Sequence, residues 1–119
     1  MSHLNHVALL VKNIESFLEK NTSLSKVRGK IQEFPSEGTR EIYIGKSSEY
    51  GRLLLIEAIG KGPYKDALDK RGVVLHHLAI DVPKIDDFIG ELSGSGWYVH
   101  PRSLWFYDDN KQVFLARPG

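Results

Sequence analysis

The stretch LNHVALLV at residues 4–11 returns as LHHLAIDV at residues 75–82, and this pair of segments decides the fold. The two segments align without a gap, which places His6 over His77. A match of this kind between distant parts of one chain indicates that a structural unit is repeated. We therefore predict two copies of one folding motif.

Each copy has the pattern of a β-strand followed by an α-helix. Residues 4–11 and 75–82 are mostly apolar and have polar boundaries, as expected of buried strands. After each strand, apolar residues recur at i, i+3 and i+4, which places them on one face of a helix. They are Ile14, Phe17 and Leu18 in the first copy, and Ile85, Phe88 and Ile89 in the second. Asn13 is expected to cap the first helix.

Three more strands are expected after each helix. They are expected near residues 26–34, 39–45 and 52–59 in the first copy, and near residues 97–102, 104–108 and 112–117 in the second. Between the copies we expect a short helix from Pro63 to Lys70, because Pro favours the first turn of a helix. The predicted fold class is α+β, with two tandem βαβββ units in a single domain. The expected ranges are residues 3–59 for unit one, 63–70 for the linker helix and 73–118 for unit two.

The composition is that of an ordinary globular domain and argues against several classes of function. The 119 residues include 16 basic and 15 acidic ones that are interspersed, so nucleic acid is not an expected partner. The absence of cysteine excludes a thiol nucleophile and thiolate metal ligands. No apolar run approaches the roughly 20 residues that span a membrane, and the first residues lack the features of a signal peptide. We expect a cytoplasmic protein.

Two βαβββ units with a His in each first strand resemble the vicinal oxygen chelate superfamily, which includes glyoxalases, bleomycin-resistance proteins and dioxygenases. The linker GPYKDALDKRG at residues 62–72, followed by LHHLA at residues 75–79, is similar to the methylmalonyl-CoA epimerase branch. The resemblance implies that the two units form one cup around a divalent metal. It also implies one ligand from the first strand and one from the last strand of each unit. Such a metal holds two adjacent substrate oxygens and acts as a Lewis acid.

The first-strand ligand positions of that family fall on His6 and His77. Strand alternation supports this assignment, because each His shares a face with small residues. The last-strand positions depart from the family pattern. In unit two the position falls on Phe114, which cannot bind a metal ion. In unit one, two registers compete, and they place either Leu54 or Glu57 on the ligand position.

These residues set the expected metal chemistry. Two imidazoles without a carboxylate make a poor site, since catalytic zinc sites usually have three protein ligands. If Glu57 joins His6 and His77, the resulting two-His-one-carboxylate set suits Fe, Ni, Co or Zn. We therefore expect a divalent metal, namely Co, Ni, Zn, Fe or Mg, that is weakly bound or absent.

Other residues are candidates for lining the cup. They are Leu54, Phe114, Tyr43, Asp81, His100 and Arg102. The late aromatic residues suit core and dimer packing, or alternatively an aromatic wall for a ligand. We predict a homodimer that binds a small-molecule ligand in the cup.

Three functions are compatible with this sequence. The first is metal-assisted proton transfer next to a carbonyl, as in an isomerase or lyase of the epimerase or glyoxalase type. The second is metal-free binding of a small molecule, as in the bleomycin-resistance branch. The third is a degenerate module that uses the fold to dimerise.

Overall fold

The chain divides between Asp81 and Val82 into two units. The computed structural model describes residues 2–46, 51–100 and 112–116. The larger unit is His3–Asp81, and the smaller unit contains the chain from Val82 onward together with the first two residues. The division differs from the expected one at the linker, because the first strand of the second copy is hydrogen-bonded into the sheet of the first.

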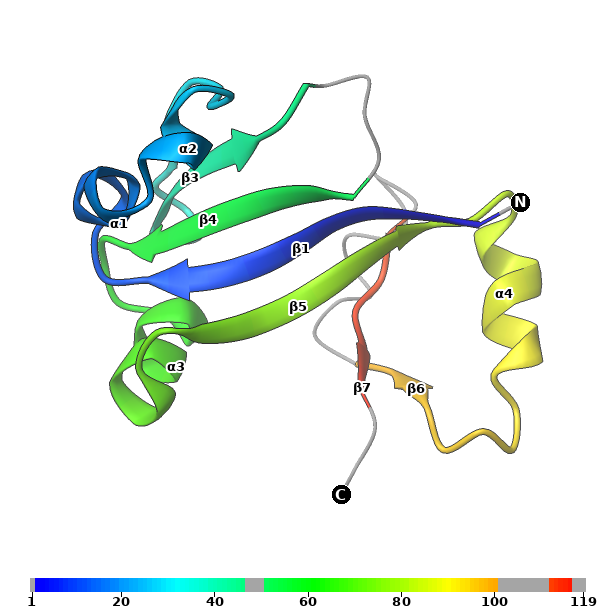
Figure 1. The fold of residues 1–119 in the computed structure, drawn as a ribbon. Helices are drawn as coiled ribbons and strands as arrows, with labels where there is room; N and C mark the ends of the chain where they lie inside the picture. The colour runs from blue at the N-terminus through cyan, green and yellow to red at the C-terminus, as the bar shows by residue number, and fades with distance from the viewer. Residues whose placement is uncertain (1, 47–50, 101–111, 117–119) are drawn as a thin grey trace. The chain divides into compact units, whose positions relative to one another are not determined.

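The larger unit is built on a curved five-stranded sheet with the strand order β2-β3-β4-β1-β5 (Figure 1). Its strands are β1 (His3–Val11), β2 (Gln32–Phe34), β3 (Thr39–Ile44), β4 (Arg52–Ala58) and β5 (Val74–Asp81). Strand β1 lies between β4 and β5, parallel to β4 and antiparallel to β5. The strand expected at residues 26–34 is shorter than predicted. Helix α2 (Thr22–Ser25) and an isolated bridge from Arg28 to Ile44 occupy the approach to β2.

One face of the sheet packs against α1 (Ile14–Lys20). The helix begins where predicted, since the Asn13 side chain accepts a hydrogen bond from the Ser16 backbone N–H at 2.8 Å. The core on this face consists of Val11, Ile14, Leu18, Ile42, Ile44 and Leu55. The helical spacing predicted for Ile14 and Leu18 therefore matches their burial.

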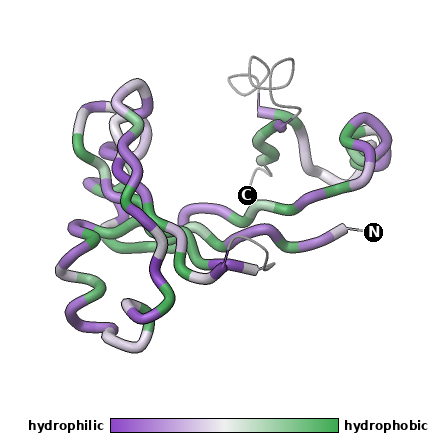
Figure 2. Tube along the Cα trace, turned by 90° about the horizontal axis from the view of Figure 1, so that it is seen from above, coloured by the Kyte–Doolittle hydropathy of each residue, from purple (hydrophilic) through white to green (hydrophobic). Residues whose placement is uncertain are grey.

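The opposite face carries His6 and is called the His6 face below. Ala8 lies two residues after His6 in β1 and therefore shares this face, as does Leu54, its partner in β4. Helix α3 (Pro63–Arg71) covers one end of it through Tyr64, Ala67 and Leu68. Strand β4 is mostly hydrophobic in sequence, whereas α3 is mostly hydrophilic; Figure 2 colours the described chain by this property. Helix α3 therefore packs through a small part of its surface.

The smaller unit contains α4 (Ile85–Glu91), β6 (Tyr98–Val99) and β7 (Leu115–Ala116). The two short strands pair antiparallel, and the His100 N–H donates to the Phe114 carbonyl at 2.7 Å. Helix α4 lies at the predicted position. The strand expected at residues 104–108 lies outside the described residues. In the described part of the chain, no helix is long and apolar enough to cross a membrane.

Candidate functional site

The pairing of β1 with β5 has local two-fold symmetry. His6 lies opposite Ala79, and its repeat equivalent His77 lies opposite Ala8. Such reciprocal pairing places equivalent residues of the two copies around one axis that passes between the strands. The two strands that the sequence repeat relates therefore pair with each other.

A β-bulge lies next to each of these histidines. The register of the ladder shifts at Asn5 in β1 and at His76 in β5, and these two positions are equivalent in the repeat. An extra residue in one strand bends it and redirects a side chain. Each bulge brings the side chain of the extra residue into contact with the His that follows it, so that Asn5 contacts His6 and His76 contacts His77.

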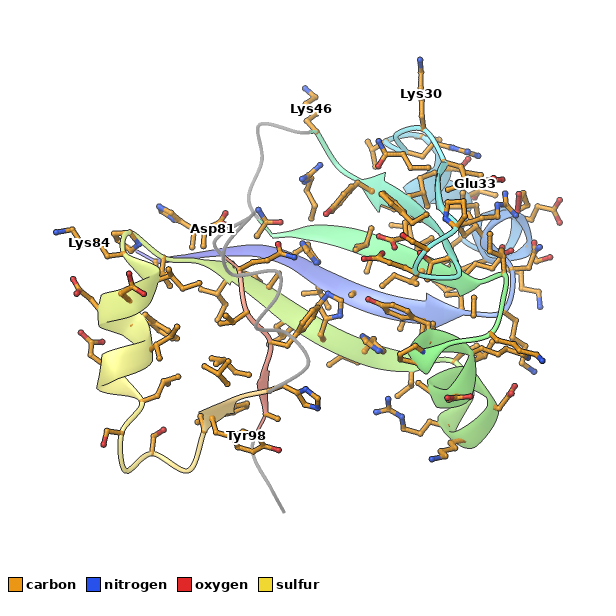
Figure 3. The ribbon with its side chains drawn as sticks, turned by 180° about the vertical axis from the view of Figure 1, so that it is seen from behind. Lys30, Glu33, Lys46, Asp81, Lys84 and Tyr98 are labelled. Atoms are coloured by element: carbon orange, nitrogen blue, oxygen red, sulfur yellow. The ribbon has the colours of Figure 1, made fainter. Side chains whose placement is uncertain are left out.

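A chain of hydrogen bonds connects these side chains. The Nδ1 atoms of His76 and His77 are 2.7 Å apart, and the Nε2 atoms of His77 and His6 are 3.2 Å apart. The chain continues from His6 Nδ1 to Asn5 Oδ1 at 2.7 Å, and from Asn5 Nδ2 to Asp81 Oδ2 at 2.9 Å. Figure 3 labels Asp81, at the end of β5.

Asp81 determines the direction of this chain, because a carboxylate only accepts hydrogen bonds. Asn5 must donate through Nδ2, so its Oδ1 accepts from the Nδ1–H of His6. A neutral His6 then has its lone pair on Nε2 and accepts from the Nε2–H of His77. His77 in turn accepts at Nδ1 from His76. His77 is thus the donor and His6 the acceptor in the hydrogen bond between their Nε2 atoms.

Both central imidazoles are held neutral near pH 7. Burial lowers the pKa of His77 to about 4, and the neighbouring His76 and His6 act in the same direction. Burial also lowers the pKa of His6, with Arg52 acting in the same direction and Asp81 opposing it. Neutral imidazoles are the form that shares hydrogen bonds or binds a metal.

Acid should destabilise the protein through His77. Its folded-state pKa of about 4 lies below the ordinary histidine value of 6.5. Between these values the unfolded chain binds more protons than the folded one, so stability falls as the pH drops through this window. Urea unfolding should show a smaller loss of stability from pH 6.5 to pH 4 for His77→Gln than for the parent. Parallel stability curves for the two proteins would contradict this assignment.

The His pair fits two positions of a metal site. Two nitrogens bound to a tetrahedral zinc at about 2.0–2.1 Å lie about 3.3 Å apart, and the observed Nε2 separation is 3.2 Å. The remaining donors do not fit. A third metal ligand on the His6 face would have to come from Leu54, the β4 partner of Ala8, and its side chain has no atom that binds a metal. In the described part of the chain, no three His, Cys, Asp or Glu side chains are grouped to hold an ion.

Glu57 lies on the opposite face, so it cannot join His6 and His77 around one ion in this structure. It pairs with Val11 in the β1–β4 ladder and is 7% exposed. Its Oε1 accepts from the backbone N–H of Ile14 at 2.8 Å, and its Oε2 forms a salt bridge with Arg40 at 3.2 Å. Glu57 thus binds the first turn of α1, where a carboxylate is favourable.

A cation and an aromatic ring lie beside the His pair. Arg52 is the β4 partner of His6, and its guanidinium carbon is 4.0 Å from the centre of the Tyr43 ring. The same Tyr43 ring meets His6 edge-on, with ring centres 5.5 Å apart. Tyr43 was expected to line the site from its sequence, but Arg52 was not.

Glu41 was also missed by the sequence analysis. It lies two residues before Tyr43 in β3 and pairs with Ile56, which places it on the His6 face. Burial raises the pKa of Glu41, although a hydrogen bond from Thr39 at 2.7 Å partly opposes this effect. A carboxylate whose pKa is raised by burial is suited to general acid–base chemistry. Strand alternation from Tyr43 would have identified it.

The remaining candidates belong to the smaller unit or are not described. Phe114 and His100 lie next to β7 and β6, respectively. Arg102 lies outside the described residues, as do the late aromatics from Trp105 to Tyr107. The structure therefore brings together His6, His77, Asp81, Tyr43 and Leu54 in the larger unit.

The fold belongs to the glyoxalase-like class, with mixed α and β elements and a curved sheet. A hypothetical protein from Bacillus halodurans C-125 is similar, with a TM-score of 0.69 and 24% identity over 82% of this chain and 71% of that chain. Methylmalonyl-CoA epimerase from Mycobacterium tuberculosis has a TM-score of 0.67 and 20% identity, over 85% of this chain and 69% of that chain.

A third similar structure is a variant of Streptomyces coelicolor methylmalonyl-CoA epimerase in complex with 2-nitronate-propionyl-CoA. It has a TM-score of 0.65 and 16% identity, over 82% of this chain and 74% of that chain. No protein-family model matches the chain, and no curated protein matches it in sequence. At these identities the comparisons establish the fold.

Proposed function

We propose that this protein belongs to the epimerase and glyoxalase branch of the vicinal oxygen chelate superfamily and transfers a proton next to a carbonyl. The observation that carries the proposal is the convergence of the His6 and His77 Nε2 atoms, 3.2 Å apart, at the two-fold axis of the repeat. The similarity of the fold to methylmalonyl-CoA epimerases supports the reaction type.

In this proposal His77, Glu41 and the hydrogen-bond chain to Asp81 each have a separate role. When the substrate binds, its carbonyl oxygen replaces His6 Nε2 as the acceptor of the His77 Nε2–H, which stabilises the negative charge that develops there. Glu41 removes the proton from the adjacent carbon, because its raised pKa makes it a stronger base than an ordinary glutamate. The hydrogen-bond chain through Asn5 to Asp81 holds the His pair in its tautomers.

A divalent metal, if bound, would be held by His6 and His77 and would polarise the carbonyl. We expect weak binding because Leu54 supplies no third donor. In addition, His77 must first move its Nε2 proton to Nδ1, which His76 occupies. The positive charge of Arg52 opposes a second cation beside His6, as it does the protonation of His6.

Exchange of the proton next to the carbonyl tests the proposal. In D₂O, the protein should exchange deuterium into methylmalonyl-CoA or 2-oxobutyrate faster than buffer alone. The exchange should persist with a chelator present. We expect the reaction to proceed without a metal, and kcat/KM for methylmalonyl-CoA should therefore lie below about 10⁴ M⁻¹s⁻¹. Exchange of neither compound above the buffer rate would refute the proposal.

A further inference from the structure

Arg52 stands out among the buried polar groups of the described chain because its charge has no counter-charge there. Its Nε is buried and has no hydrogen-bond partner among the described residues. Buried polar groups in folded proteins nearly always have such partners. Arg40, on the other face of the sheet, shows the usual arrangement, since it forms salt bridges with both Glu15 and Glu57.

The carboxylates closest to the His6 face are engaged elsewhere. Asp81 accepts a hydrogen bond from Asn5, and Glu41 accepts one from Thr39. Within the described ranges, neither forms a salt bridge with Arg52. Among the described residues the Arg52 Nε–H therefore lacks an acceptor, which a group from outside the chain could supply.

Tyr43 holds this guanidinium in place beside the reactive pair. The Arg52 guanidinium carbon lies 4.0 Å from the Tyr43 ring centre, within the range of a cation–π interaction. Because Tyr43 also contacts His6, the same ring fixes the cation and the imidazole relative to each other. A ligand bound at His6 and His77 would meet a cation that is already ordered, which favours its binding.

From this arrangement we infer that Arg52 and Tyr43 form an anion subsite that binds a carboxylate of the ligand next to the His pair. A guanidinium matches a carboxylate through two parallel hydrogen bonds. The inference rests on the proposed function only for the position of the reacting carbonyl. The ligand would be a small carbonyl compound with a carboxylate close to that carbonyl. The fixed cation of the protein, rather than a metal, would hold it.

Binding of malonate, without any reaction, tests the subsite. In NMR titrations with ¹⁵N-labelled protein, malonate should shift the Arg52 Nε–H signal saturably, whereas neutral malonamide should not. Arg52→Gln should weaken malonate binding about tenfold to hundredfold, the range expected for lost hydrogen bonds to a charged group. Arg52→Lys should lose less, because it keeps the charge. The exposed Arg28 provides the control, and Arg28→Gln should bind as the parent does.

Several results would overturn the inference. One is malonate affinity that is equal in Arg52→Gln and the parent. Another is a shift that sodium chloride reproduces at matched ionic strength. Binding of inorganic phosphate without malonate would overturn the assignment to a carboxylate. If Arg52→Gln does not fold, the Nε–H titration of the unaltered protein still decides. Arg52-dependent malonate binding without deuterium exchange would refute the proposed function and leave the subsite standing.

Discussion

Leu54→Glu is expected to turn a weak metal binder into a protein that Zn²⁺ or Co²⁺ stabilises strongly. On the His6 face, Leu54 lies across β1 from His77, with Ala8 between them, and His6 is two residues from Ala8. A carboxylate at position 54 would complete a set of two His and one carboxylate, which is sufficient for a catalytic-type site. The substitution stays within the larger unit, so it does not depend on Phe114.

The stability of the variant should depend on the metal. Leu54 is 3% exposed, and loss of its packing costs about 2–5 kcal/mol by comparison with truncations. A buried carboxylate without a cation adds to this cost. Metal at a thousandfold excess over its dissociation constant should return about 4 kcal/mol. In thermal melts, Zn²⁺ should therefore raise the Tm of Leu54→Glu clearly. The Tm of the parent should change little at the same Zn²⁺ concentration.

A second substitution in the same background shows whether the designed ligands are used. His77→Ala combined with Leu54→Glu should remove most of the metal-dependent stabilisation, because it deletes one of the three ligands. Leu54→Gln provides a neutral control of similar size. If the parent and Leu54→Glu respond equally to Zn²⁺, the ligands lie elsewhere and the assigned face of β4 is wrong.

The sequence contained the information on most strands and faces, because side chains alternate along a regular strand. The alternation of His6 and Ala8, and the register that places Leu54 on the ligand position, describe the same face that the sheet shows. Glu57 is three residues further along, so it must point to the other side. Its role in holding Ile14 and Arg40 depends on contacts that no local pattern specifies.

The bulges could not be predicted from the repeat. Their effect is to place Asn5 beside His6 and His76 beside His77, whereas strict alternation puts neighbours on opposite faces. The tautomers of the site follow from these contacts. The division of the chain after Asp81 was also unforeseen. The pairing of β5 with β1 itself agrees with the repeat, which relates these two strands.

The cation of the site was hidden by a different effect. Arg52 is one of 16 basic residues, and most of them suit a solvated surface. What distinguishes it is a relation among three strands, since it pairs with His6 in β1 and stacks on Tyr43 in β3. Those strands are adjacent to β4 only in the folded sheet. The position of this cation beside His6 is therefore a property of the folded sheet that a ligand motif does not contain.

Glu41→Gln is expected to reduce deuterium exchange about 10²- to 10⁴-fold, the usual effect of losing a general base. The amide has nearly the same shape and can still accept from Thr39, so stability should change little. Malonate binding at Arg52 should persist, which separates loss of the base from loss of the ligand site. Glu33→Gln, in β2 and labelled in Figure 3, is the exposed control and should exchange at the parent rate.

The pH dependence of exchange distinguishes a base from a residue that only supports the fold. Burial raises the pKa of Glu41, so the acid limb of the exchange rate should lie above the ordinary value of 4.5 for a glutamate. The hydrogen bond from Thr39 lowers the pKa of Glu41 and thus opposes burial. Thr39→Val should therefore move the acid limb to still higher pH while the plateau rate persists. An acid limb that is the same in Thr39→Val and the parent would mean that another group removes the proton.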